Sequence, residues 1–124
     1  MKARCEIIAE TSPDVVISIH QNSYTDRSVC GAQVFYYKES EEGARLAGLI
    51  QNQLIQGVDP DNTRVPKSNM NYYMLKQSPV PIVIVECGFL SNSTEAERLT
   101  TDSYQEKCAW AIQLGILRYL NMAN

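Results

Sequence analysis

Two short, largely apolar runs dominate the hydrophobic pattern of this chain, and each run ends abruptly in one ionisable residue. The first run covers residues 15–19 and ends at His20, and the second covers residues 82–85 and ends at Glu86. Continuous β-branched runs of this length are typical of strands that are buried on both faces of a parallel sheet. We therefore predict two central strands, each with a polar side chain at its carboxyl end.

Helical spacing predicts the elements that would cover these strands. Ser40 is a favourable N-cap for a helix that ends at Gly57, and the leucine and isoleucine residues of this helix recur on one face. The final helix is the clearest element, because apolar residues from Tyr104 to Leu120 recur at three- and four-residue steps. Residues 3–11 also have a helical pattern, whereas residues 32–37 alternate as a strand.

The remaining stretches are less regular. Residues 58–71 predict a long loop, and residues 71–75 predict a short strand. Thr94 and Glu97 fit a capping box at the start of a short helix. Helices and strands thus follow one another in an order that favours an α/β fold. We expect a largely parallel sheet flanked by helices on both faces, in a single domain of 124 residues.

Composition excludes several classes of function. The net charge of −3 and the lack of a basic stripe argue against a nucleic-acid partner. No apolar stretch approaches the roughly 20 residues of a transmembrane segment, and no signal peptide is visible at the start. The four cysteines have no CxxC spacing, which excludes a zinc ribbon. Buried free thiols are the favoured interpretation, and a disulfide stays open.

The residues that end the two runs are the main candidates for chemistry. Ligands of open α/β folds bind beyond the carboxyl ends of parallel strands, so we expect His20 and Glu86 to meet in one site. An imidazole can bind zinc, and a buried carboxylate with a raised pKa can act as a general base. Catalytic zinc takes about three protein ligands, of which this sequence offers one obvious candidate. Taken singly, each residue could instead be a strand-end side chain without function.

Three basic residues surround the irregular loop: Arg64, Lys67 and Lys76. They could bind an acidic substrate, such as a peptide that carries carboxylates. Each could equally be an ordinary solvated residue of that loop.

Several segments resemble zinc-dependent N-acetylmuramoyl-L-alanine amidases. Residues 17–23, ISIHQNS, are similar to the SIHxN segment of that family, and residues 85–92, VECGFLSN, are similar to its VExGFxSN segment. Residues 31–37, GAQVFYY, resemble the family's G-x-x-x-Y-Y strand, and the final helix also fits. The likeness covers nearly the whole chain in order, and it is closest to the spore-cortex type of these amidases.

The resemblance implies a role for three residues. His20 matches a zinc ligand, Glu86 matches the catalytic glutamate, and Asn22 would orient the substrate. The implied reaction is hydrolysis of the amide bond between N-acetylmuramic acid and the L-alanine of the stem peptide, by a water that zinc activates. Peptidoglycan would be the partner, and the cell envelope, outside the cytoplasm, would be the place of action.

The sequence also differs from the family pattern in one respect. The family has two further zinc ligands, a histidine and a glutamate, and both lie upstream of the segment that residue 1 matches. We therefore expect residues 1–124 to be a partial catalytic domain that lacks its N-terminal part. Alone, it should bind zinc weakly, hydrolyse little, and associate with itself through an uncovered sheet edge. The alternatives are a peptidoglycan-binding α/β module without catalysis and a plain partner-binding α/β domain.

Overall fold

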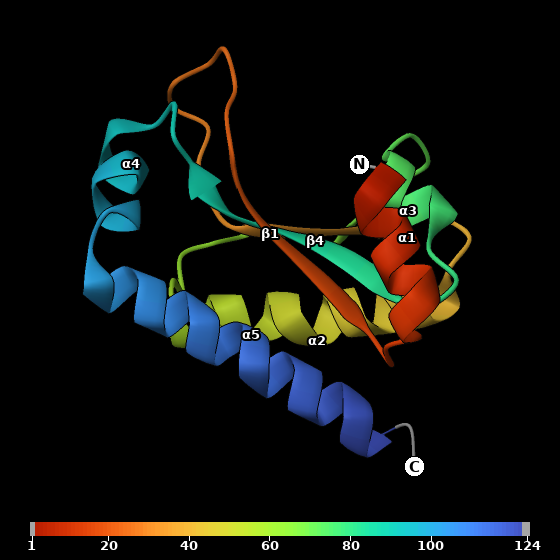
Figure 1. The fold of residues 1–124 in the computed structure, drawn as a ribbon. Coiled ribbons are helices and arrows are strands. Elements are labelled where there is room, and N and C mark those ends of the chain that lie inside the picture. The colour runs from red at the N-terminus through yellow and green to blue at the C-terminus, as the bar shows by residue number, and fades with distance from the viewer. Residues whose placement is uncertain (1, 123–124) are drawn as a thin grey trace.

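The computed structural model describes residues 2–122, and they form one sheet with helices on both faces (Figure 1). The strands lie in the order β1-β4-β2-β3. This arrangement confirms the predicted α/β class. The strands are β1 Val16–Asn22, β2 Gln33–Tyr37, β3 Lys67–Asn69 and β4 Ile82–Phe89. The helices are α1 Lys2–Thr11, α2 Glu41–Gly57, α3 Tyr73–Gln77, α4 Ser93–Leu99 and α5 Asp102–Met122.

The direction of each strand decides which residues share an end of the sheet. β1 pairs with β4 in parallel, β2 pairs with β3 in parallel, and β2 pairs with β4 antiparallel. Because β2 runs against β4, the first residue of β2 lies beside the carboxyl-terminal half of β4. Gln33 is accordingly the pairing partner of Glu86.

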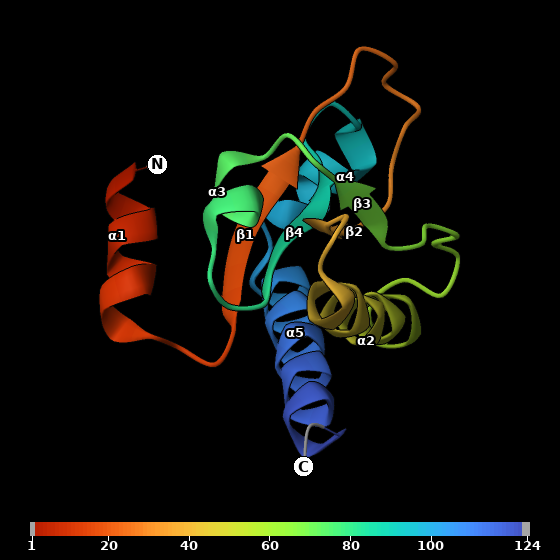
Figure 2. The same cartoon turned by 90° about the vertical axis from the view of Figure 1, so that its right-hand side faces the viewer.

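The alternation of side chains along β4 separates two apolar cores. Val83, Val85 and Cys87 pack into the larger core with α2 and α5, whereas Ile82 and Ile84 pack into the smaller core with α1 and α3. Figures 1 and 2 show α2 and α5 together on one side of the sheet, with α1 and α3 on the other. All eight residues of β4 are buried, as the apolar run predicts.

The prediction of a strand at residues 71–75 was wrong, because the helix α3 begins at Tyr73 within this segment. The Oδ1 atom of Asn69 accepts hydrogen bonds from the backbone N–H groups of Asn71 and Tyr72, at 2.7 and 2.9 Å, and turns the chain. The helix then buries Met74 and Leu75 in the smaller core. The predicted loop before it also contains the short strand β3.

The predicted capping box at Thr94 and Glu97 was wrong as well. Asn92 is the N-cap of α4, and its Oδ1 atom accepts a hydrogen bond of 3.1 Å from the backbone N–H of Glu95. Asparagine is among the strongest N-cap residues, so the helix begins at Ser93. None of the helices in residues 2–122 is long and apolar enough to cross a bilayer.

Candidate active site

His20 and Glu86 lie side by side in the carboxyl-terminal halves of two parallel strands, which continue to Asn22 and Phe89. They are direct pairing partners in the β1–β4 ladder, and the register shifts immediately after His20. Strand alternation places Glu86 on the same face as Ile82 and Ile84. His20 shares its face with Ser18, whose Oγ lies 2.8 Å from the Nε2 atom of the imidazole. The structure therefore brings together the two residues that the sequence singled out.

Glu86 is a buried carboxylate with spare capacity to bind a proton or a ligand. Only 7% of the residue is exposed, and the Oε2 atom of its carboxylate has no hydrogen-bond partner among the described residues. Burial raises the pKa of Glu86, and the neighbouring His20 opposes this shift. A carboxylate in these surroundings binds a proton more readily than an exposed one, which is what a general base requires.

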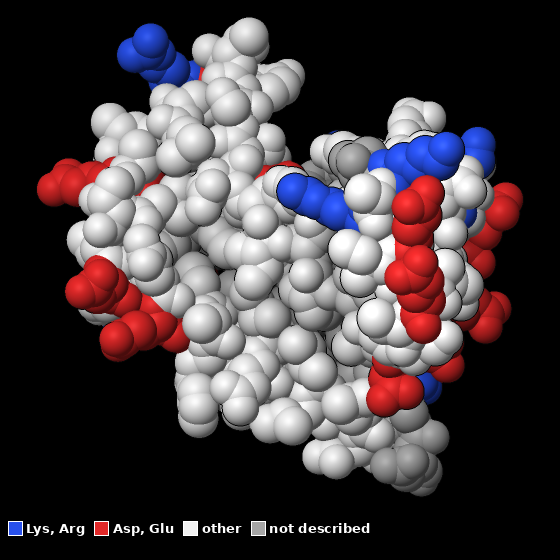
Figure 3. Space-filling view, in the orientation of Figure 1, with Lys and Arg blue, Asp and Glu red and all other residues white. Residues whose placement is uncertain are grey.

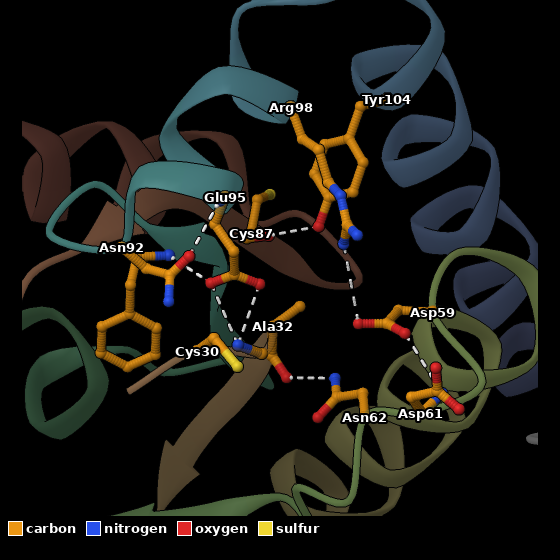
Figure 4. A network of polar contacts seen from close by, with 12 residues as sticks. Cys30, Ala32, Asp59, Asp61, Asn62, Cys87, Asn92, Glu95, Arg98 and Tyr104 are labelled. Carbon is orange, nitrogen blue, oxygen red and sulfur yellow. Dashed lines mark hydrogen bonds and ion pairs between the residues drawn. The ribbon is translucent and has the colours of Figure 1, made fainter. Parts of the chain in front are cut away.

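The backbone that follows Glu86 is fixed by two side chains that the sequence analysis did not single out (Figure 4). The buried carboxylate of Glu95 accepts hydrogen bonds from the N–H groups of Gly31 and Phe89, both at 2.9 Å. The Tyr104 hydroxyl donates to the carbonyl of Cys87 at 3.0 Å. These contacts join β4 to α4, to α5 and to the start of β2, and so hold the segment beside the candidate base.

A hollow opens on this side of the molecule. The space-filling view shows it between the part that contains α4 and the part that contains α1 and α3, and β1 and β4 cross beneath it (Figures 1 and 3). A groove of about 290 Å³ lies at the strand ends and is lined by Asn22, Gln33, Arg64, Lys67 and Phe89, among others. Asn22 is therefore placed where a substrate could contact it. Lys76, on α3, does not line this groove.

His20 and Glu86 supply part of what a catalytic zinc site needs. His20 offers an imidazole, and the unpartnered Oε2 of Glu86 offers a base beside it. Residues 2–122 contain no group of three or more His, Cys, Asp or Glu side chains that could hold a metal ion. Cys87 follows Glu86 in sequence, but it packs into the opposite core. The described residues thus fit one side of a zinc site, with one ligand and the base.

A parallel strand pair that carries an imidazole beside a buried carboxylate is an arrangement suited to metal-dependent hydrolysis. Comparison with known proteins narrows this class. The model of the N-acetylmuramoyl-L-alanine amidase family matches residues 1–118, and the chain belongs to this family. The family is zinc-dependent in general.

Relatives and solved structures agree with this assignment. The germination-specific N-acetylmuramoyl-L-alanine amidase of Bacillus subtilis is 35% identical over 119 residues, which is 96% of this chain and 50% of that protein. The CwlD amidase of Clostridioides difficile, solved in complex with the GerS lipoprotein, is 42% identical with a TM-score of 0.95. That match covers 98% of this chain and 61% of the other. AmiC2 of Nostoc punctiforme is 33% identical with a TM-score of 0.89, over 98% of this chain and 66% of that one.

The matches also define how much of each relative this chain represents. The chain spans about half the length of the first two curated relatives that it matches, 50% and 51%. The similarity to an amidase of germination agrees with the resemblance to the spore-cortex type that the sequence motifs gave.

Proposed function

We propose that this chain carries the base and one metal ligand of a peptidoglycan amidase, which hydrolyses the amide bond between N-acetylmuramic acid and L-alanine. The pairing of His20 with the buried, unpartnered carboxylate of Glu86 is the observation that supports this proposal most strongly. Membership of the amidase family supplies the reaction class. Because the relatives include cell wall amidases, we propose peptidoglycan as the partner and the cell envelope, outside the cytoplasm, as the location.

In this proposal each residue has a distinct role. Glu86 takes a proton from the attacking water onto its carboxylate and later donates it to the amine that leaves. His20 binds zinc, which, when bound, polarises the amide carbonyl and lowers the pKa of water. Asn22, at the end of β1, orients the substrate from the adjoining groove. The other zinc ligands come from outside the described residues, because these hold no group of three ligands.

A hybrid enzyme tests this proposal directly. The 124 residues replace the matching segment of the C. difficile CwlD amidase, with which they share 42% identity, and release of the stem peptide from muramyl peptides is measured. We expect zinc-dependent turnover in the hybrid. Glu86→Gln should lower the turnover by about a hundredfold or more, since general-base catalysis contributes roughly 10²–10⁴-fold. The exposed carboxylate of Glu106 on α5 gives the matched control, and Glu106→Gln should leave the turnover unchanged.

A second candidate function is a peptidoglycan-binding module without catalysis. It is favoured for the chain alone by one observation, that the described residues contain no complete set of metal ligands. Under the amidase proposal, the isolated chain binds zinc weakly and hydrolyses little. Metal analysis and turnover of the isolated chain test this expectation, and tight stoichiometric zinc together with hydrolysis would refute it. A hybrid that binds peptidoglycan equally well with and without Glu86→Gln, and never cleaves it, would support the binding module.

A further inference from the structure

The groove near Glu86 also carries charged residues that the proposed reaction does not use. Gln33 lines this groove and is the direct pairing partner of Glu86 on the neighbouring strand. Directly opposed residues on one face of an antiparallel pair lie about 5 Å apart at their Cβ atoms. The groove is therefore within reach of a substrate whose scissile bond lies at Glu86.

The charged side chains that line this groove are all positive. Arg64 lines it from the segment that leads into β3, and Lys67 lines it as the first residue of that strand. None of the described lining residues is acidic. Neither cation forms an ion pair with a carboxylate in the part of the chain that the structure describes. The groove therefore presents two positive charges whose balance must come from solvent or from a ligand.

Arg64 is held in place before any ligand arrives. Its Nε atom donates to the carbonyl of Cys30 at 2.8 Å, and its Nη1 atom donates to the Oε1 atom of Gln33 at 2.9 Å. Its guanidinium group also stacks on the ring of Phe89, 4.9 Å from the ring centroid. Among the described residues, these hydrogen bonds use Nε and Nη1, so the Nη2 atom can donate to an outside acceptor. A fixed guanidinium loses little further conformational freedom when it binds a carboxylate, which favours affinity.

We propose that Arg64 and Lys67 form a carboxylate-binding subsite that selects acidic stem peptides over amidated ones. This inference rests on the proposed amidase function, because that function places a stem peptide at Glu86. The ligand is a peptide carboxylate a short distance from the scissile bond. Arg64 binds it through a charge-assisted hydrogen bond, and Lys67, which is exposed, adds a second positive charge at the rim.

The test compares two ligands of the same size. N-acetylmuramoyl-L-alanyl-D-glutamate carries free carboxylates, and its diamide carries none. Binding of each to the 124-residue chain is measured by calorimetry, with Glu86→Gln in place to prevent cleavage. We expect the acid to bind about tenfold more tightly at low salt, because hydrogen bonds to charged groups have this order of strength. The preference should shrink as the salt concentration rises.

Variants of the two cations separate the subsite from a general charge effect. Arg64→Gln should reduce the preference for the acid to about twofold or less. Because Arg64 also bonds to Cys30 and Gln33, its variant is checked by thermal unfolding. Lys67→Gln has no such contacts to lose, and it should reduce the preference by about threefold. Lys76→Gln, on α3 outside the groove, is the matched control and should change nothing.

Several results would overturn the subsite. The subsite is refuted if the acid and the diamide bind equally well, or if neither binds at millimolar concentration. It is also refuted if the preference for the acid persists in both Arg64→Gln and Lys67→Gln. The proposed function fails separately, in the hybrid enzyme. Turnover that depends on Glu86 without any preference for the acid removes the subsite alone. A preference for the acid that depends on Arg64, without turnover, supports the subsite and removes the amidase proposal.

Discussion

At the scale of single residues, Glu86 is the most informative position. Its carboxylate is buried in the carboxyl-terminal half of a fully buried strand, one oxygen has no partner among the described residues, and an imidazole lies beside it. A buried carboxylate without full compensation costs stability, so a protein that retains one gains something else from it. We interpret that gain as catalysis.

The pH dependence of stability follows from the raised pKa of Glu86. At a pH below 4.5, the ordinary pKa of a glutamate, the Glu86 carboxyl is protonated in both the folded and the unfolded chain. As the pH rises from 4.5 through the higher pKa of the folded state, the unfolded chain loses this proton first, and the free energy of unfolding falls. Glu86→Gln should therefore stabilise the metal-free chain at neutral pH, and this advantage should narrow as the pH falls toward 4.5. Urea unfolding at several pH values measures the difference. A Gln variant that is less stable at pH 7, or a difference independent of pH, would contradict the assignment.

Glu95 gives a second prediction at this scale. Its carboxylate accepts hydrogen bonds from Gly31 and Phe89, and an amide in its place would turn an N–H group toward an N–H donor. Glu95→Gln should lower the free energy of unfolding by about 1–3 kcal/mol, the usual cost of an unsatisfied buried group. Glu97→Gln, an exposed residue of the same helix, should have little effect. Denaturant unfolding of both variants measures the two losses of stability. Equal stabilities of the two variants would show that the hydrogen bonds of Glu95 to Gly31 and Phe89 do not stabilise the fold.

Sequence reasoning reached His20 and Glu86 because both interrupt apolar runs, and such interruptions are local signals. It did not reach Glu95 or assign Arg64 a fixed place, because each of these side chains depends on a bond to a backbone group far along the chain. Gly31 is 64 residues from Glu95, and Cys30 is 34 residues from Arg64. No spacing rule links positions so distant. The sequence could show only that Asn22 lies near the site.

At the scale of elements, the long periodic segments were predicted correctly, as were the strand β2 and the short helix α4, whereas β3 and α3 were not. α2 and α5 follow their apolar stripes, and Ser40 caps α2 as expected, accepting from Gly43 at 2.8 Å. β3 has three residues and α3 has five, too few to show a period. Their conformations depend on tertiary contacts, namely pairing with β2 and burial of Met74 and Leu75.

The packing of α2 against α5 predicts opposite effects of two glycine substitutions, at Gly115 and at Gly48. A Cβ atom at Gly115 would lie 2.7 Å from the Cα of Ile50, so the two helices approach each other at this point. Gly115→Ala should cost about 1–3 kcal/mol, because the gain in helix propensity is smaller than the strain of separating the helices. At Gly48 a Cβ would meet nothing within 4 Å, and Gly48→Ala should stabilise the chain by roughly 0.5–1 kcal/mol. Thermal unfolding compares them, and a stabilising Gly115→Ala would contradict the packing.

At the scale of the whole molecule, the α/β class was predictable from the order of the elements, but the direction of β2 was not. Nothing in the alternation of residues 32–37 distinguishes a parallel from an antiparallel neighbour. The antiparallel pairing matters, because it brings Gln33, and with it the cationic groove, next to Glu86.

The sheet also predicts how the isolated chain behaves in solution. β1 lies at one end of the strand order, and its Ile19 side chain is 58% exposed. An edge strand with exposed apolar residues is a template for pairing with another chain. We expect the isolated chain to associate with itself at micromolar concentrations, and Ile19→Lys to reduce this association. Sedimentation or sizing experiments measure it, and a strictly monomeric parent chain would refute the expectation.

The central claim is that His20 and Glu86 act together in one active site. The most direct test is the turnover of the hybrid amidase with His20→Ala, Glu86→Gln and both changes together. Residues that act as a unit show losses that do not multiply. We predict that the double variant is about as inactive as the more damaging single variant. A double variant whose loss equals the product of the two single losses would show that the two residues act independently, and would contradict the claim.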